Sequence, residues 1–374
     1  MFNAAPATIL MTADTVGGVW TYALALTRAL APYGTQVALA TMGAPLSESQ
    51  WQEVAAISNL TVYESHYKLE WMDKPWDDVA EAGEWLLQLQ DTVQPDLIHL
   101  NGMVHGQLAW GKPVLVVVHS CVLSWWQAVH GEPAPEAWST YRTQVQQGLQ
   151  AADLVVAPTT AMLQEAARLY GPFQQQAVIY NGCDASLFQP AELKELFVFS
   201  MGRIWDEAKN LKLLAEAAPK LPWPVYIAGN AHHPTTGATL TLPNVELLGQ
   251  LTPEEAATWL NRASIYVMPA RYEPFGLTVL EAALAGCALV VGDIESLREV
   301  WGEAACYVRP DDAEGLHATL QHLINNPEVR HQLADRARLR AERYTTASMA
   351  KTYRELQAAS LRLQAASSQH EPGV

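Results

Sequence analysis

Two glutamates, Glu273 and Glu281, stand eight positions apart around a Pro-Phe-Gly turn. Pro274 disfavours helical backbone angles at Glu273, and Gly276 lets the main chain approach a ligand closely. A helix that starts after this turn presents unpaired N–H groups and a partial positive charge, which attract a phosphate. Carboxylates on either side accept hydrogen bonds from neighbouring sugar hydroxyls. The pattern predicts a site for a sugar joined to a phosphate. A plain loop glutamate followed by a helix-dipole partner is the alternative.

Two cations, Arg203 and Lys209, follow Gly202 at the end of an apolar run and stand six positions apart. A diphosphate that departs from a sugar gains negative charge, and fixed cations beside it lower the barrier as a metal ion otherwise would. Arg203 offers a planar fork of donors, whereas Lys209 offers a compact point charge. Two surface cations near Asp206 and Glu207 are the alternative.

The elements that must position these residues alternate between short apolar runs and helical patterns. In the first half, the expected strands are 8–12, 36–41, 96–100, 114–118, 154–157 and 177–180, and the expected helices are 20–30, 77–93, 141–150 and 160–170. In the second half, strands are expected at 196–200, 225–228, 245–248, 264–268 and 289–292, with a helix from Leu277 that ends near Gly286. This order predicts an α/β fold of parallel strands with helices on both faces. Ligands of such sheets bind at the carboxyl ends of strands, where the glutamates and cations fall.

Four motifs in chain order resemble the signature of retaining family-four glycosyltransferases. They are Gly17-Gly18 after the first strand, His119 after an apolar strand, Gly202-Arg203 with Lys209, and E-x(7)-E with an embedded PFGL at 273–281. Members of that family have the GT-B fold. The resemblance therefore implies two Rossmann-like domains whose parallel sheets face a central cleft.

The resemblance also implies a role for each matching position. Glu273 contacts the transferred sugar, and His119 orients that sugar by hydrogen bonding rather than by proton abstraction. Arg203 and Lys209 hold the diphosphate, and together with Glu273 and His119 they form the expected catalytic set. The expected donor-binding set consists of Glu281, which holds the ribose, and of positions where the backbone meets the donor, namely Gly17, Gly18, Gly229, Phe275, Gly276 and Leu277.

A chain of 374 residues suits two domains. We expect an N-terminal Rossmann-like, acceptor-side domain over 1–188 and a C-terminal Rossmann-like, nucleotide-sugar-binding domain over 189–346. A helix over 347–366 is expected to cross back to the first domain, followed by a disordered tail over 367–374. The Trp- and Pro-rich segment Cys121–Trp138 is expected as a long loop that either lines the acceptor or packs against its domain.

Composition excludes several classes of protein. A net charge of −16 disfavours nucleic-acid binding and docking on anionic lipid. No apolar run is long enough to predict a transmembrane segment, and the first residues lack the pattern of a signal peptide. No metal site is expected, because His232-His233 has no further ligands at suitable spacing and the four cysteines form no C-x-x-C pair. These features favour the cytoplasm.

The expected function is a metal-independent, retaining transfer of a sugar from a nucleoside diphosphate to an acceptor hydroxyl. No cofactor is expected beyond the nucleotide sugar itself as co-substrate. The sequence does not distinguish between UDP, GDP and ADP donors, because backbone groups would contact the nucleotide base. The unknown acceptor is expected to be soluble rather than lipid-linked. The alternatives are a sugar-nucleotide epimerase of the same fold and a catalytically silent nucleotide-sugar-binding partner protein.

Overall fold

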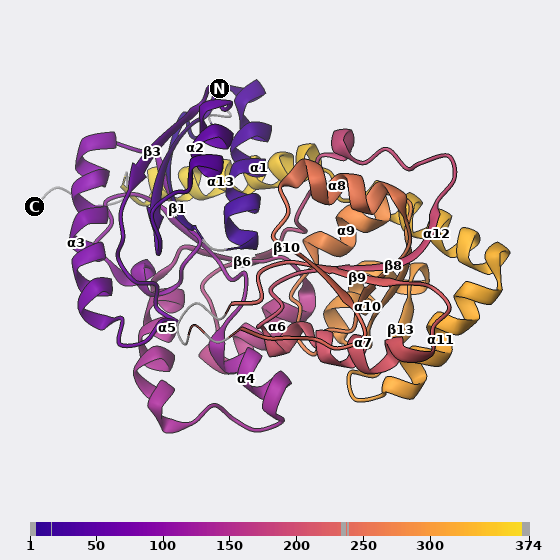
Figure 1. Ribbon diagram of the computed structural model, residues 1–374. Coiled ribbons are helices and arrows are strands. Elements are labelled where there is room, and N and C mark those ends of the chain that lie inside the picture. Colours follow the sequence, from indigo (N-terminus) through magenta and orange to yellow (C-terminus); the bar gives the residue numbers. More distant parts are fainter. Residues whose placement is uncertain (1–4, 16, 233–236, 238, 369–374) are drawn as a thin grey trace, which may run out of the picture. The chain divides into compact units, whose positions relative to one another are not determined.

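The computed structural model describes residues 5–15, 17–232, 237 and 239–368 (Figure 1). Contacts divide the chain into two units, of which the first comprises residues 1–124, 133–182 and 346–374. The second comprises residues 125–132 and 183–345. The division falls after Gly182, a few residues before the expected boundary at 188. The short segment 125–132 joins the second unit, which the sequence did not indicate.

The first unit contains a seven-stranded sheet in the order β3-β2-β1-β4-β5-β6-β7. Every pair of neighbouring strands is parallel. The strands are β1 Thr8–Asp14, β2 Gln36–Met42, β3 Leu60–Glu64, β4 Leu97–Leu100, β5 Val114–Val117, β6 Leu154–Ala157 and β7 Gln176–Val178. The strand order reverses between β1 and β4, which is where doubly wound sheets bind their ligands. The expected parallel sheet is confirmed, with β3 as an additional edge strand.

Helices of the first unit follow the strands in turn. They are α1 Gly18–Leu30, α2 Glu48–Ala55, α3 Trp76–Val93, α5 Ser139–Ala151, α6 Thr160–Tyr170 and α13 Thr346–Ser368, while α4 Val122–His130 begins with this unit's residues. The Thr159 side chain starts α6 by accepting a hydrogen bond from the backbone N–H of Met162. Segment 121–138 was expected as a loop, but it contains α4 and the 3-10 turn η3 Glu136–Trp138. Its Pro residues come after α4 and therefore do not interrupt the helix.

The last helix, α13, belongs to the first unit although it follows the second unit in sequence. It begins one residue before the expected start at 347 and continues to Ser368. Met349 and Tyr353 pack into the core of the first unit, which explains why the chain returns there. Residues 369–374 of the expected disordered tail lie outside the described residues.

The second unit contains a six-stranded parallel sheet in the order β10-β9-β8-β11-β12-β13. The strands are β8 Glu195–Met201, β9 Val225–Ala228, β10 Glu246–Gly249, β11 Ala263–Met268, β12 Ala288–Gly292 and β13 Cys306–Val308. The helices are α7 Leu211–Ala217, α8 Pro253–Arg262, α9 Leu277–Leu284, α10 Glu295–Trp301, α11 Ala313–Asn325 and α12 Pro327–Ala341. Further 3-10 turns in the chain are η1 Ala31–Tyr33, η2 Val104–Gln107, η4 Ala185–Leu187, η5 Glu207–Lys209, η6 Ala218–Lys220 and η7 Gly302–Ala304.

The central strands β11 and β12 of the second sheet are buried on both faces, as helices on both sides of the sheet require (Figure 1). Phe197 and Phe199 of β8 point into the core that contains α9, whereas Val198 between them points into the core that contains α7 and α11. Successive side chains of a strand alternate between faces, so one continuous apolar run supplies both cores. The side chains of this strand are thus occupied by core packing, and residues that bind or react with a ligand lie at the strand ends.

The backbones of α5 and η2 touch in the first unit, which generates a stability prediction. A Cβ added at Gly148 would lie 2.0 Å from the carbonyl oxygen of Met103. Gly148→Ala should therefore lower the free energy of unfolding by about 2 kcal/mol or more, since backbone cannot move aside cheaply. Urea unfolding would measure this loss. Gly111→Ala is the control, because no neighbouring atom lies within 4 Å of its added Cβ. Equal stability of the two variants would contradict the packing.

Candidate functional site

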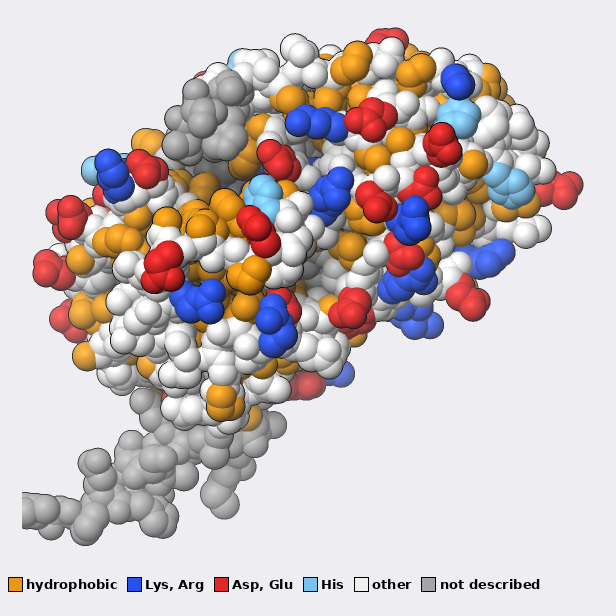
Figure 2. Space-filling view, turned by 90° about the horizontal axis from the view of Figure 1, so that it is seen from below, with side chains coloured by type: hydrophobic (Ala, Val, Ile, Leu, Met, Phe, Trp, Pro, Cys, Tyr) orange, Lys and Arg blue, Asp and Glu red, His pale blue; other side chains and the backbone are white. Residues whose placement is uncertain are grey.

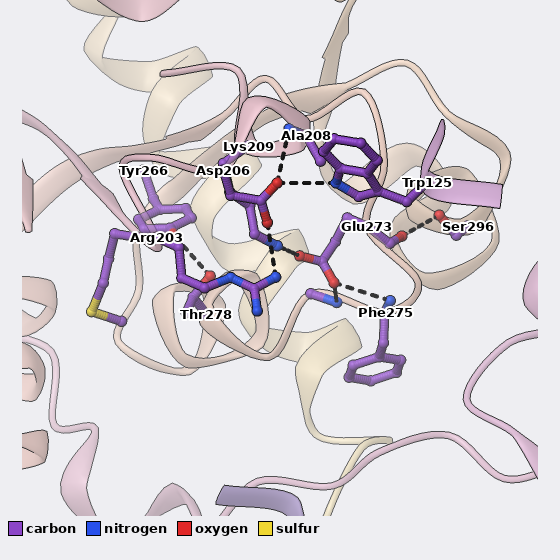
Figure 3. A network of polar contacts seen from close by, with 12 residues as sticks. Trp125, Arg203, Asp206, Ala208, Lys209, Tyr266, Glu273, Phe275, Thr278 and Ser296 are labelled. Atoms are coloured by element: carbon purple, nitrogen blue, oxygen red, sulfur yellow. Dashed lines mark hydrogen bonds and ion pairs between the residues drawn. The ribbon is translucent and has the colours of Figure 1, made fainter. Parts of the chain in front are cut away.

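The predicted cations and the first glutamate meet at adjacent strand ends of the second unit. Strands β8 and β11 are parallel neighbours, with Phe199 opposite Tyr266. Arg203 and Lys209 lie on the loop after β8, and Glu273 lies on the loop after β11. The two loops also bond through their main chains, since the N–H of Arg271 donates to the carbonyl of Ala208 (2.8 Å). The structure thus brings together residues that are far apart in sequence (Figure 3).

An ion pair between Lys209 and Glu273 joins these two loops. The Lys209 Nζ donates to Oε2 of Glu273 at 2.6 Å, and the two side chains are only 15% and 12% exposed. Solvent screens such a pair much less than a surface pair. Lys209 is the last residue of the turn η5, which contains part of the segment between the two cations.

Glu273 also accepts hydrogen bonds from the backbone at the start of α9. Its Oε1 accepts hydrogen bonds from the backbone N–H groups of Phe275 (3.3 Å) and Gly276 (2.9 Å), while its carbonyl accepts one from Ser296 Oγ (2.5 Å). Gly276 adopts a left-handed backbone (φ 89°) at the N-cap, which explains the glycine. The amides of Phe275 and Gly276, two of the three positions of this turn that were expected to meet the donor, are thus already partnered. A carboxylate has about four acceptor positions, so one remains for a ligand hydroxyl.

Phe275 can meet a ligand only through its main chain. The Phe275 side chain is buried and packs edge-on against Tyr344, with ring centroids 5.7 Å apart. Leu277 packs against the same core and is partly buried. Their predicted backbone contacts with a donor stay predictions.

Arg203 is held by an acidic neighbour and an aromatic ring. Its Nη2 donates to Oδ2 of Asp206 at 2.8 Å, and its Cζ lies 5.3 Å from the centroid of the Trp205 ring. Asp206 is almost fully buried, whereas the Arg203 side chain is 42% exposed. Burial by itself would raise the pKa of Asp206, but neighbouring cations and N–H donors hold that pKa below its ordinary value. The sequence treated Asp206 only as a surface partner.

Trp125 is a site residue that the sequence did not assign. Its indole Nε1–H donates to Oδ1 of Asp206 at 3.1 Å (Figure 3). Trp125 lies on α4, and its contacts place it with the second unit. The only sequence signal was the Trp-rich character of the segment, because a contact over 81 positions has no local pattern.

Gly229 is required by close packing of two strand ends. Its backbone has a φ of 140°, and an added Cβ would lie 1.7 Å from the carbonyl oxygen of Gly202. Any side chain there would displace the loop that carries Arg203. This geometry explains the glycine, while its role beside a nucleotide base stays a prediction.

Glu281 occupies a different environment from Glu273. It lies in the second turn of α9. Desolvation raises the pKa of its carboxyl group to about 7. Within the described part of the chain, no hydrogen bond or ion pair reaches this carboxylate. Such a group can accept hydrogen bonds from the paired hydroxyls of a ribose, although that role stays a prediction.

Three predicted residues, Gly17, Gly18 and His119, lie in the first unit. Gly17 is the N-cap of α1, with φ 94°, and Gly18 is the first residue of that helix. The helix start has no side-chain cap, so the main chain of this glycine pair forms the turn itself. Val16 of the same loop lies outside the described residues.

His119 follows β5 and is held as a neutral imidazole. Asn101 donates its amide N–H to the carbonyl of Thr12 (2.7 Å), so its amide oxygen faces Nε2 of His119 at 2.8 Å. An amide oxygen only accepts, so Nε2 carries the proton and Nδ1 is left as an acceptor. Desolvation lowers the pKa of His119 to about 3, and the ring of Tyr22 lies edge-on to it at 4.5 Å. This chemistry suits hydroxyl orientation better than proton abstraction.

The comparisons with known proteins agree with this fold. Residues 16–187 match the model described as Glycosyltransferase Family 4, and residues 195–326 match the model described as Glycosyl transferases group 1. The chain is 28% identical over 313 residues to a glycogen synthase of Mycobacterium tuberculosis, covering 72% of this chain and 65% of that protein. It is 28% identical over 206 residues to a phosphatidyl-myo-inositol mannosyltransferase of Mycolicibacterium smegmatis, covering 50% and 53%. The chain thus spans less than two thirds of the length of both curated relatives.

Solved structures share the architecture. Sucrose-phosphate synthase from Thermosynechococcus elongatus superposes with a TM-score of 0.77 at 20% identity, covering 94% of this chain and 99% of that one. HepE from Anabaena, in complex with UDP-glucose, gives a TM-score of 0.74 at 17% identity, covering 94% and 99%. These likenesses establish a GT-B fold. Since the two family matches together span most of the chain, the chain belongs to the family-four glycosyltransferases.

The described residues contain neither a metal-ligand cluster nor a helix that could span a membrane. No cluster of three or more His, Cys, Asp or Glu side chains suited to a metal occurs there. His232 accepts or donates one hydrogen bond with Thr239 (2.7 Å), and His233 lies outside the described residues. None of the described helices combines the length and apolar character needed to span a bilayer. Figure 2 shows acidic and basic side chains interspersed on the face that it draws.

The raised pKa of Glu281 generates a prediction about pH and stability. A carboxyl group with a folded pKa of about 7 keeps its proton when the unfolded chain has already lost it near pH 4.5. The free energy of unfolding should therefore fall as pH rises from about 4.5 to 7. Glu281→Gln removes this penalty, so its stability relative to the parent protein should increase between pH 5 and pH 8.

Urea unfolding at four pH values across that range would measure the effect. Glu84→Gln, at an exposed position of α3, is the matched control and should show no such trend. A parallel pH dependence of the parent and Glu281→Gln proteins would contradict the desolvated carboxyl group.

Proposed function

We propose that the chain transfers a sugar from a nucleoside diphosphate to an acceptor hydroxyl, with retention at the anomeric carbon and without a metal ion. The observation that carries this proposal is the Lys209–Glu273 pair at the adjacent ends of β8 and β11, with Arg203 on the same loop as Lys209. Two cations thereby stand beside a carboxylate and a helix start. This is the arrangement that an activated sugar and its diphosphate need.

In the proposed reaction, the bond between the anomeric carbon and the diphosphate oxygen breaks while the acceptor oxygen bonds to that carbon from the same face. The acceptor proton passes to the departing phosphate oxygen. Arg203 and Lys209 neutralise the charge that develops on the diphosphate, in a site that is already organised around them. No side chain is assigned as a nucleophile in this front-face reaction.

Other groups hold the substrate. Glu273 has an acceptor position left for a sugar hydroxyl, and Glu281 offers a carboxylate to the ribose. His119 orients the sugar through Nδ1, since Nε2 is committed to Asn101. HepE, whose structure contains UDP-glucose, supports a nucleoside diphosphate sugar as the donor. UDP, GDP and ADP sugars remain equal candidates, because no described side chain singles out one base.

We also propose that the protein is cytoplasmic and that its acceptor is soluble. The four cysteines of the chain are free thiols, which suits the reducing cytoplasm. The net charge of −16 favours a soluble acceptor over one presented on an anionic membrane.

A donor panel tests the function directly. Thermal-shift screening with UDP-, GDP- and ADP-sugars selects the donor, and product formation is then measured with an acceptor panel. Anomeric proton couplings in NMR spectra of the product report retention or inversion. Conversion of the donor to an epimer without any acceptor would instead establish an epimerase. Tight binding with no turnover on any acceptor would establish a silent binder.

Arg203→Ala should lower turnover by about 100-fold or more, because one charge partner of the transition state is lost. Steady-state kinetics would measure the loss. Arg262→Ala is the matched control in the same unit, since Arg262 pairs with Glu195 at the opposite end of the strands. Near-normal turnover of Arg203→Ala would contradict the proposed role of this cation.

Glu281→Ala should raise the donor KM more than it lowers kcat, because the ribose is held equally in the ground and transition states. Initial rates at varied donor concentration would separate the two constants. An unchanged donor KM would remove Glu281 from ribose binding and leave the other assignments intact.

A further inference from the structure

Asp206 sits at the centre of the polar network around Arg203, although neither the family motifs nor the proposed reaction gives it a role. It lies three positions after Arg203 and three before Lys209, on the loop after β8. It is 5% exposed, so it cannot contact a bound substrate freely. Its effect on any reaction must therefore pass through the groups that it touches.

Three donors fix the Asp206 carboxylate, two from its own loop and one from α4. Oδ1 accepts from the indole of Trp125 (3.1 Å) and from the backbone N–H of Ala208 (3.0 Å). Oδ2 accepts from Nη2 of Arg203 (2.8 Å). With both oxygens engaged, the carboxylate has one defined orientation (Figure 3).

Arg203 depends on that orientation. Among the described residues, its guanidinium makes no hydrogen bond other than the one to Asp206. The side chain is 42% exposed and would otherwise sample many rotamers. Asp206 accepts a hydrogen bond at one edge of the guanidinium, and the Trp205 ring packs against one face of it. The remaining N–H groups can therefore donate to a phosphate.

We propose that Asp206 is a positioning residue for Arg203, and that the indole N–H of Trp125 keeps Asp206 in place. This inference rests on the proposed role of Arg203 at the diphosphate. It assigns a function to α4, because Trp125 of this helix donates an N–H group to the loop that carries Arg203, more than 75 positions later in the sequence. Because a fixed cation needs no reorganisation during the reaction, this arrangement raises turnover rather than affinity.

Charge balance gives the proposal a second consequence. Arg203 and Lys209 face the carboxylates of Asp206 and Glu273, so the resting network has no net charge. Removing the Asp206 charge leaves one cation uncompensated and strengthens attraction for any diphosphate. Turnover should therefore fall while product affinity is kept or rises, a combination that a purely structural role would not produce.

Asp206→Asn is the decisive variant, because it keeps the size and the acceptor oxygen for Trp125 and Ala208. Its amide N–H₂ cannot accept from Arg203. We expect kcat to fall on the order of 10- to 100-fold, while the Kd for UDP, GDP or ADP, measured by calorimetry, stays equal or decreases. A fall in kcat together with a matching rise in Kd and a lower Tm would overturn the proposal in favour of a structural role.

Trp125→Phe and Trp126→Phe form a matched pair of neighbouring substitutions. Trp125 donates to Asp206, whereas the buried indole N–H of Trp126 has no hydrogen-bond partner in the described structure. Trp125→Phe should lower kcat by about tenfold, as expected for one hydrogen bond to a buried charge. Trp126→Phe, which keeps an aromatic ring, should not. Equal losses in both variants would show that ring packing, and not the N–H, is responsible.

A double-mutant cycle isolates the path through Arg203. If Asp206 acts only by positioning Arg203, adding Asp206→Asn to Arg203→Ala should cost no further turnover. A full additional loss would overturn the proposal.

An NMR readout separates this inference from the proposed function. In protein labelled with 15N-tryptophan, the indole signal lost in Trp125→Phe should shift in Asp206→Asn, while the signal lost in Trp126→Phe should not. An unshifted Trp125 signal would overturn the inference even in an active enzyme. A parent protein that turns over no nucleotide sugar would instead refute the proposed function, whatever the spectra show.

Discussion

The ion pair between Lys209 and Glu273 is the interaction on which the rest of the site depends. It links the loop after β8 to the loop after β11, and the two side chains are largely removed from solvent. A buried pair stabilises a structure only when its remaining polar atoms are satisfied. Glu273 meets this condition because its second oxygen accepts from two backbone N–H groups at the start of α9. The cation, the turn and the helix start consequently form one connected unit.

The two glutamates of the motif have the same side chain but different surroundings, which give their carboxyl groups different properties. Glu273 stands before the helix, where a cation and the helix-start amides surround its carboxylate. Glu281 stands inside the helix, where desolvation raises the pKa of its carboxyl group to about 7. Glu273 is therefore held by three protein donors with one acceptor position left for a ligand, whereas no hydrogen bond from the described residues engages the Glu281 carboxylate. The eight-residue spacing produces this difference, because it places the second glutamate one full turn beyond the helix start.

Close backbone contacts and acidic neighbours keep the cations in position. Gly229 and Gly202 touch through their main chains, which leaves no space for a side chain where the β8 and β9 loops meet. Asp206 then holds Arg203 by a hydrogen bond, and Trp125 holds Asp206 by another. In the first unit, Asn101 plays a comparable part for His119 by fixing which ring nitrogen carries the proton. Both units thus orient a polar group with a neighbour that the sequence motifs do not mark.

The sequence by itself determined the alternation of strands and helices, the parallel sheets, and the placement of Arg203, Lys209 and Glu273 at strand ends. These features follow from local patterns, since apolar runs of strand length, glycine turns and a proline before a helix act over a few residues. Only the tertiary structure decided that Lys209 pairs with Glu273, that Asp206 is buried against Trp125, and that the segment after His119 contains a helix which joins the second unit. Those outcomes depend on which strands lie side by side and on how helices pack over them. Contacts across 64 and 81 positions leave no periodic trace in the chain.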